Sequence, residues 1–237
     1  MTQTRRFAAI SMAALALLGS GVRGDPPDVA PAPFKGTLDS SVLVAHGVKV
    51  GAATYRGRSA VHLANQPGWD REAIAIVSGS SFRDGSIEVD VAGQPEAGAS
   101  EGARGFIGLA FRVAGTGSDV DGFECFYVRP TNGRADDQLR RNHSTQYISA
   151  PDFPWHRLRK ESPGVYESYA DLEAGAWTHL RAEVAGRKAR LYVNRAGQPA
   201  LVVNDLKRDP AQGAVGLWIG SETEGWFSNL RIAPRQP

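Results

Sequence analysis

Glu124 is the acidic residue of this sequence that is best placed to do chemistry. It lies within Phe123-Glu-Cys-Phe-Tyr127, a segment that is otherwise apolar and aromatic, and its strand face would also carry Phe126 and Val128. A carboxylate in such surroundings either pairs with a cation or has a raised pKa, which suits a general acid/base or an acceptor for sugar hydroxyls. Two interpretations follow: a structural ion pair with an arginine, or a catalytic group in a binding cleft.

A basic and aromatic stretch follows directly, over residues 129–160. It holds seven basic and three acidic residues, mixed with amide and aromatic side chains. Aromatic faces stack on sugar rings, and arginine or asparagine side chains bind hydroxyls and carboxylates. A solvated basic loop is the alternative. With Arg112, which shares a strand face with the small residues Gly108 and Ala110, the expected ligand-binding set is Arg112, Glu124, Arg129, Asn132, Arg141, Asn142, Tyr147 and Trp155.

Metal and cofactor chemistry has little support in the sequence. The five histidines show no paired ligand spacing, so we expect no zinc site and no cofactor. The segment around Asp119 and Asp121 resembles the opening of a calcium loop but lacks the distal glutamate, so we favour an ordinary acidic turn and leave calcium open. Cys125 is the only cysteine, which excludes an internal disulfide and suggests a small core residue.

The elements that must position these side chains are strands. Short apolar runs recur with period-2 alternation, as in Ser86–Val91, and Gly, Pro, Asn and Asp separate them. Such patterning predicts an all-β fold, a two-sheet antiparallel jelly-roll sandwich. We find no helical stretch, and residues 136–168 form a long aperiodic segment of the kind that is often functional. The predicted strands are 42–45, 48–55, 60–63, 73–77, 85–91, 105–113, 122–129, 145–149, 177–184, 189–193, 200–203, 213–219 and 226–232.

The start of the chain is typical of an export signal. Arg5 and Arg6 precede a short apolar run, and small residues lie before Asp25. We therefore predict a signal peptide over 1–24, a proline-rich linker over 25–34 and one jelly-roll domain over 35–237, in a secreted or periplasmic protein with no membrane span. Removing residues 1–24 lowers the basic count from 27 to 24 against 25 acids, so the net charge becomes −1. That balance gives no reason to expect nucleic acid as a partner.

Four segments resemble the concanavalin A-like lectin/glucanase superfamily, and most closely bacterial laminin-G-like and keto-disaccharide-hydrolase-type domains. They are 105–112, 123–130, 213–218 and 227–230, and the resemblance covers about residues 35–233. It implies a jelly roll that hosts lectins, glycosidases, lyases or adhesion modules. The glucanase branch carries three carboxylates on one strand, whereas Glu88 and Asp90 here lack the third.

These observations support three hypotheses about function. The first is an exported carbohydrate-binding domain for a poly- or oligosaccharide, with an acidic glycan favoured by the basic segment. The second is a glycoside hydrolase or lyase in the same cleft, with Glu124 as the acid/base and Arg129 and Tyr147 supporting it. The third is a structural or protein-interaction module. The sequence leaves the oligomeric state open.

Overall fold

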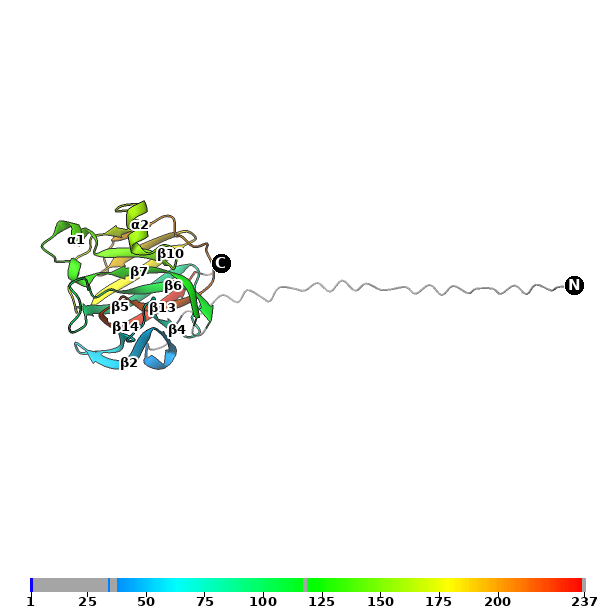
Figure 1. The fold of residues 1–237 in the computed structure, drawn as a ribbon, viewed down its shortest axis with the longest axis horizontal. Coiled ribbons are helices and arrows are strands. Elements are labelled where there is room, and N and C mark those ends of the chain that lie inside the picture. The colour runs from blue at the N-terminus through cyan, green and yellow to red at the C-terminus, as the bar shows by residue number, and fades with distance from the viewer. Residues whose placement is uncertain (2–33, 35–37, 117–118, 236–237) are drawn as a thin grey trace.

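The computed structural model describes residues 1, 34, 38–116 and 119–235, which form two facing antiparallel sheets of seven strands each (Figure 1). The predicted jelly-roll sandwich is confirmed. The strands are β1 (Leu43–His46), β2 (Val48–Tyr55), β3 (Arg58–Asn65), β4 (Ala73–Val77), β5 (Gly85–Pro95), β6 (Ile107–Thr116), β7 (Asp119–Val128), β8 (Thr145–Ala150), β9 (Glu167–Ser168), β10 (Thr178–Ala185), β11 (Lys188–Val193), β12 (Leu201–Val203), β13 (Ala214–Ile219) and β14 (Thr223–Pro234). The first sheet has the order β1-β4-β13-β6-β7-β8-β9, and the second has the order β12-β11-β10-β5-β14-β3-β2.

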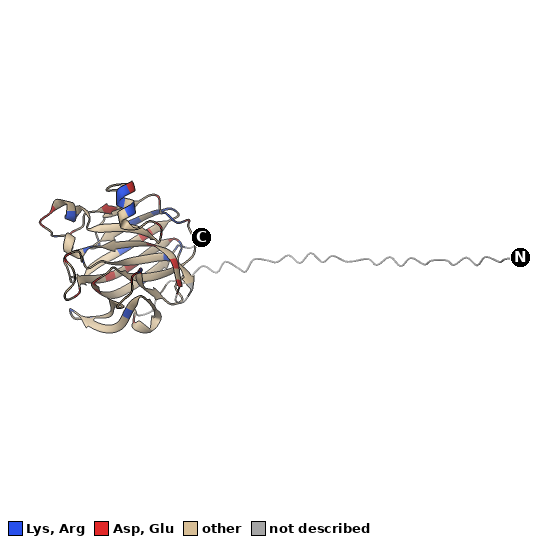
Figure 2. Cartoon of the chain, in the orientation of Figure 1, with Lys and Arg blue, Asp and Glu red and all other residues tan. Residues whose placement is uncertain are grey.

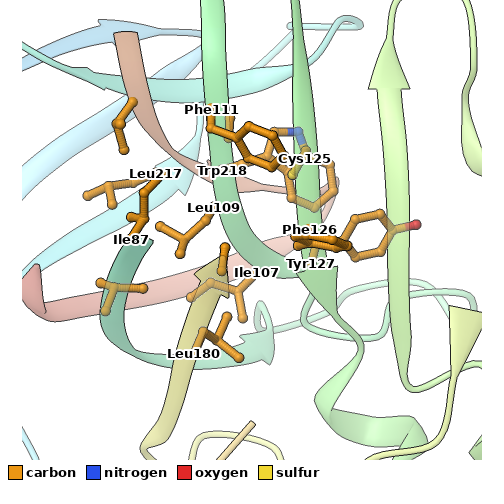
Figure 3. Close-up of a cluster of buried hydrophobic side chains, with 14 of the residues drawn as sticks. Ile87, Ile107, Leu109, Phe111, Cys125, Phe126, Tyr127, Leu180, Leu217 and Trp218 are labelled. Carbon is orange, nitrogen blue, oxygen red and sulfur yellow. The ribbon is translucent and has the colours of Figure 1, made fainter. Parts of the chain in front are cut away.

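The core lies between the inner faces of the two sheets. Leu217, Leu109 and Phe126 lie side by side in register on β13, β6 and β7, and all three are fully buried. Ile87 and Leu180 reach the same core from the second sheet (Figure 3). Each such side chain contributes about 1.5–3 kcal/mol by leaving water, so this alternation holds the sandwich together.

The outer face of the first sheet carries the other set of alternating residues. Trp218, Gly108 and Tyr127 are in register across β13, β6 and β7. Gly108 leaves a gap that the neighbouring rings cover, because the Trp218 and Tyr127 ring centroids lie only 4.7 Å apart. A methyl group on Gly108 would lie 2.1 Å from the Phe126 carbonyl oxygen. The small residue therefore allows two large aromatic side chains to meet above the sheet.

The aperiodic segment contains two helices that the sequence analysis did not predict. They are α1 (Gln138–Asn142) and α2 (Trp155–Glu161), and β9 is a further short element that was missed. The Asp137 carboxylate caps α1 by accepting a hydrogen bond from the Arg140 backbone N–H at 3.0 Å. Elements of two to seven residues are too short to show a hydrophobic period, so their patterns could not reveal them. All thirteen predicted strands correspond to observed ones.

The predicted signal peptide and most of the predicted linker lie outside the described residues. Phe34, at the end of that linker, bonds to the sandwich, because its backbone N–H donates to the Ile232 carbonyl at 3.1 Å. Among the described residues, no helix is long and apolar enough to cross a membrane. The domain boundaries stay predictions.

Candidate functional site

A groove of about 600 Å³ lies on the outer face of the first sheet. Trp218 and Tyr127 form its floor. The β3–β4 loop with Trp69 forms one wall, and Phe106 and Trp155 line it from the other elements. Trp155 at the start of α2 is 44% exposed, whereas the floor residues are nearly fully buried. The groove therefore offers at least one open aromatic surface above a rigid aromatic base.

Glu72 is the carboxylate that the groove holds most tightly. It lies at the end of the β3–β4 loop, and its Oε2 accepts a hydrogen bond from the Trp218 indole N–H at 2.6 Å. The Trp69 indole N–H donates to the Glu72 backbone carbonyl at 3.1 Å, which fixes the loop. Burial raises the pKa of Glu72, and the Trp218 hydrogen bond opposes that shift only in part. A carboxyl group with a raised pKa beside a groove can donate a proton or a hydrogen bond.

A second pocket of about 270 Å³ adjoins the groove, and Phe106 and Trp155 line both. We call it the arginine pocket, after its lining residues Arg104, Arg129, Arg140 and Arg159. His143 and Asn132 complete its polar wall. Basic residues also mark α1 and α2 in Figure 2. The two adjoining cavities thus differ in character, one aromatic with carboxylates at its rim and the other basic.

Arg129 lines the arginine pocket and is 5% exposed. Its guanidinium donates to the His143 carbonyl at 2.9 Å, the Tyr127 hydroxyl at 2.8 Å and the Gln146 side-chain oxygen at 3.1 Å. It also lies 4.9 Å from the Tyr127 ring centroid. Burial is the main cause that lowers the pKa of Arg129, and the Arg159 charge adds to it. The same burial raises the pKa of Tyr127.

The structure brings together three of the residues predicted to bind ligand. Arg129, Asn132 and Trp155 all line the arginine pocket. The Asn132 amide donates to the His143 carbonyl at 3.2 Å, the same oxygen that Arg129 contacts. This part of the predicted set therefore has a common location.

Glu124 and Tyr147 lie together elsewhere, on the inner face of the first sheet. The Tyr147 hydroxyl donates to Glu124 Oε2 at 2.5 Å, and the Arg208 backbone N–H donates to Glu124 Oε1 at 2.8 Å. Both side chains are fully buried. Burial raises the pKa of Glu124, while the hydrogen bonds from Tyr147 and Arg208 lower it. This geometry gives Glu124 structural partners and no open cleft, so its catalytic role stays a prediction.

The remaining predicted residues are scattered. Arg112 lies in the middle of β6 and spans to the second sheet, donating to the Asp84 carboxylate at 3.0 Å and the Gly186 carbonyl at 2.7 Å. Arg141 donates to the Tyr169 hydroxyl at 2.8 Å on the protein surface. The exposed Asn142 accepts a hydrogen bond from Gln138 at 2.8 Å. None of these three lines the groove or the arginine pocket.

The paired carboxylates of β5 belong to a network on the outer face of the second sheet. Asp90 accepts hydrogen bonds from Asn229 at 2.8 Å and Arg58 at 3.1 Å, and it lies 2.8 Å from His179 Nδ1. Glu88 Oε2 lies 3.5 Å from His179 Nε2. Burial tends to raise the pKa of Asp90, but the partners prevail and lower it. Among the described residues no group of three potential metal ligands occurs, and Asp119 and Asp121 are exposed at the start of β7.

Sequence reasoning did not identify Glu72, Trp69 or Trp218 as site residues. Trp218 is buried, at 6% exposure, and it lies on the outer face, where it forms the groove floor. The pairing of β4 with β13 sets Trp218 opposite Ile74 and so brings Glu72 next to Trp218, although the two residues are 146 positions apart in the sequence. The only local signal was an aromatic and charged run, Trp69 to Glu72, directly before an apolar strand.

No protein-family model and no curated protein matches the chain. Among solved structures it is similar to a carbohydrate-binding module from Bacillus subtilis, with a TM-score of 0.51, 15% identity, and coverage of 80% of this chain and 97% of that one. It is also similar to a native glycosidic hydrolase, with a TM-score of 0.50, 13% identity, and coverage of 88% and 98%. At such identities the likeness shows the fold alone, a jelly-roll sandwich of two antiparallel sheets.

Proposed function

We propose that this chain is an exported carbohydrate-binding domain that holds an oligosaccharide, with acidic glycans favoured, in the groove of the first sheet. The observation that carries the proposal is the adjacency of an aromatic groove and an arginine pocket that share Phe106 and Trp155. The similar carbohydrate-binding module supports it as a precedent for the fold. Export rests on the predicted signal segment.

The groove has the features that saccharide binding requires. Trp155 is exposed and Trp69 partly exposed, so each can contact the apolar face of a sugar ring. Carboxylates of Glu72, Glu96 and Glu222 line the groove and can accept hydrogen bonds from hydroxyls. A volume of about 600 Å³ lies within the usual range for small-ligand sites. The arginine pocket supplies the positive charge that would favour an acidic chain.

The test is a glycan array followed by calorimetric titration of the hits. We expect saccharides to bind, and Trp155→Ala to weaken binding about two- to tenfold, since an aromatic contact to a ring contributes about 0.5–1.5 kcal/mol beyond burial of its area. Tyr169→Ala is the matched control, because Tyr169 is 40% exposed but lines neither cavity. Absence of binding to every neutral and acidic saccharide would refute the proposal and favour a protein-interaction module.

Glu72 favours a second candidate function, a glycoside hydrolase or lyase that acts in the same groove. Its raised pKa keeps a larger share of the carboxyl protonated, as a general acid needs, and Trp218 fixes its position. In that case Glu72→Gln abolishes turnover of a bound glycan while binding is kept. Turnover that survives Glu72→Gln would remove Glu72 from the mechanism.

A further inference from the structure

The arginine pocket concentrates positive charge that the described residues neutralise only in part. Four guanidiniums line about 270 Å³, and no Asp or Glu is among the lining residues. Arg159 has a carboxylate partner, Glu167, which accepts hydrogen bonds from its Nη2 at 2.6 Å and its Nε at 2.9 Å. The same Glu167 lies 3.3 Å from His143 Nε2. Glu167 is therefore already shared between two cationic or potentially cationic neighbours.

The other three arginines make no ion pair with any residue in the described ranges. Arg129 is deeply buried yet donates only to neutral oxygens. Arg104 donates to the backbone carbonyls of Glu101 and Ala103. Arg140 Nε is buried with no hydrogen-bond partner among the described residues, and its Nη2 reaches only Asn132, at 3.5 Å. Three arginines without a carboxylate partner among the described residues therefore line one small cavity.

Such an arrangement is costly unless an anion occupies it. Buried charges require a partner, and arginine forks match carboxylate and sulfate oxygens closely. The cost is visible in the arginines themselves: burial lowers the pKa of Arg104, and the charge of Arg140 lowers it further. Burial and then the Arg159 charge likewise lower the pKa of Arg129. An oxyanion bound between these guanidiniums would raise the pKa of each arginine and so oppose the lowering that the neighbouring positive charges cause.

We propose that the arginine pocket binds the oxyanion substituent, carboxylate or sulfate, of an acidic sugar whose ring lies against Trp155 and Phe106 in the groove. This inference rests on the proposed carbohydrate-binding function and names the class of ligand. Phe106 and Trp155 line both cavities, so a ring in contact with them has its substituent next to the guanidiniums. Arg140 supplies the unpartnered N–H, and Arg129 supplies a second charge that its own hydrogen bonds hold in place.

Side-chain NMR of the full chain, which resolves arginine Nε–H signals, tests the inference with four probes. They are inorganic sulfate, methyl glucuronide, glucose 6-sulfate and methyl glucoside, each titrated at constant ionic strength. We expect sulfate to shift the Arg140 and Arg129 signals. We also expect at least one acidic sugar to bind about tenfold or more tightly than methyl glucoside, the effect of one charge-assisted contact. The preferred acidic sugar distinguishes carboxylate from sulfate.

Arg140→Gln should remove about tenfold of the affinity for the acidic sugar and leave that for methyl glucoside unchanged. Arg141→Gln is the matched control, since it makes the same change one residue along α1 on a side chain that contacts Tyr169 instead. Equal binding of acidic and neutral sugars, with no sulfate shift at Arg140 or Arg129, would overturn the inference while leaving the groove function intact. Sulfate shifts without binding of any sugar would support an anion site but overturn its assignment to a glycan.

Discussion

Replacing Glu124 with alanine is expected to destabilise the fold strongly, because its carboxylate anchors the segment after β12 to the inner face of the first sheet. The Arg208 N–H donates to Glu124, and the Lys207 N–H donates to the Tyr147 hydroxyl at 2.8 Å, which itself donates to Glu124. Alanine leaves the Tyr147 and Arg208 donors without an acceptor, at about 1–3 kcal/mol each, and adds a cavity. The sum is about 4 kcal/mol.

For a protein of this size that loss corresponds to a decrease in Tm of about 8–16 °C. Glu124→Gln keeps the volume and one acceptor oxygen, so it should cost about 1–2 kcal/mol. Urea and thermal unfolding measure both values, and hydrogen exchange at the Lys207 and Arg208 amides reports the local loosening. Glu161→Ala is the control, since its exposed ion pair with Arg157 should contribute under about 1 kcal/mol.

The same variants decide between the structural and the catalytic interpretation of Glu124. An anchoring role predicts lower stability with no specific loss of any glycan turnover in the folded fraction. A Glu124→Gln protein with wild-type unfolding behaviour that has lost turnover would refute the structural reasoning and restore the sequence-based assignment.

Four further predictions follow from the described contacts. The pKa of Glu72 is raised above 4.5 in the folded protein, so its contribution to the free energy of unfolding is full below pH 4.5 and is lost as the pH rises through the folded pKa. Glu72→Gln should abolish this pH dependence of the unfolding free energy. Cys125 is fully buried with a raised pKa, so a disulfide reagent should react only as fast as the protein unfolds, and rapid reaction in native buffer would contradict its burial. Gly108→Ala should cost about 2 kcal/mol in urea unfolding, because the added methyl meets the Phe126 carbonyl and backbone atoms of β7; an unchanged midpoint would show that the strands adjust freely. Burial lowers the pKa of His143, and the charges of Arg159 and Arg129 lower it further, while Glu167 and Asp137 act in the opposite direction. Bound sulfate should therefore raise the pKa of His143 in an NMR titration, and sulfate should bind more tightly as the pH falls. An unshifted pKa would place sulfate outside the pocket.

Alternation along the chain was sufficient to predict the sandwich, since all thirteen expected strands are present. It also placed Glu124 on one face with Phe126 and Val128, and the in-register partners of these residues show that this is the inner face. Period-2 patterning cannot say which of two faces is the inner one when both carry apolar residues, as in β7. That ambiguity is why Glu124 looked accessible in the sequence.

The site was harder to predict because long-range pairing and one local distortion create it. Arg112 has φ 53° beside a bulge in the β6–β7 register, which turns its side chain from the expected face toward Asp84 and Gly186. Antiparallel pairing of β6 and β7 sets Ile107 opposite Val128, so Arg129 lies beside the start of β6, whereas Arg112 lies five residues further along that strand. Composition alone did identify Arg129, Asn132 and Trp155, because their segment was both basic and aperiodic.

The wall that Phe106 and Trp155 share between the groove and the arginine pocket has a consequence for how strongly a ligand can be held. A ring contact and an anion contact each contribute little binding free energy alone. When one molecule carries both groups, the second contact forms at the effective concentration set by a few covalent bonds, which can raise overall affinity by roughly 10²–10⁴. A glycan whose charged group lies one sugar unit too far from the stacked ring would lose that gain. This surface would therefore select glycans by the spacing of their charges.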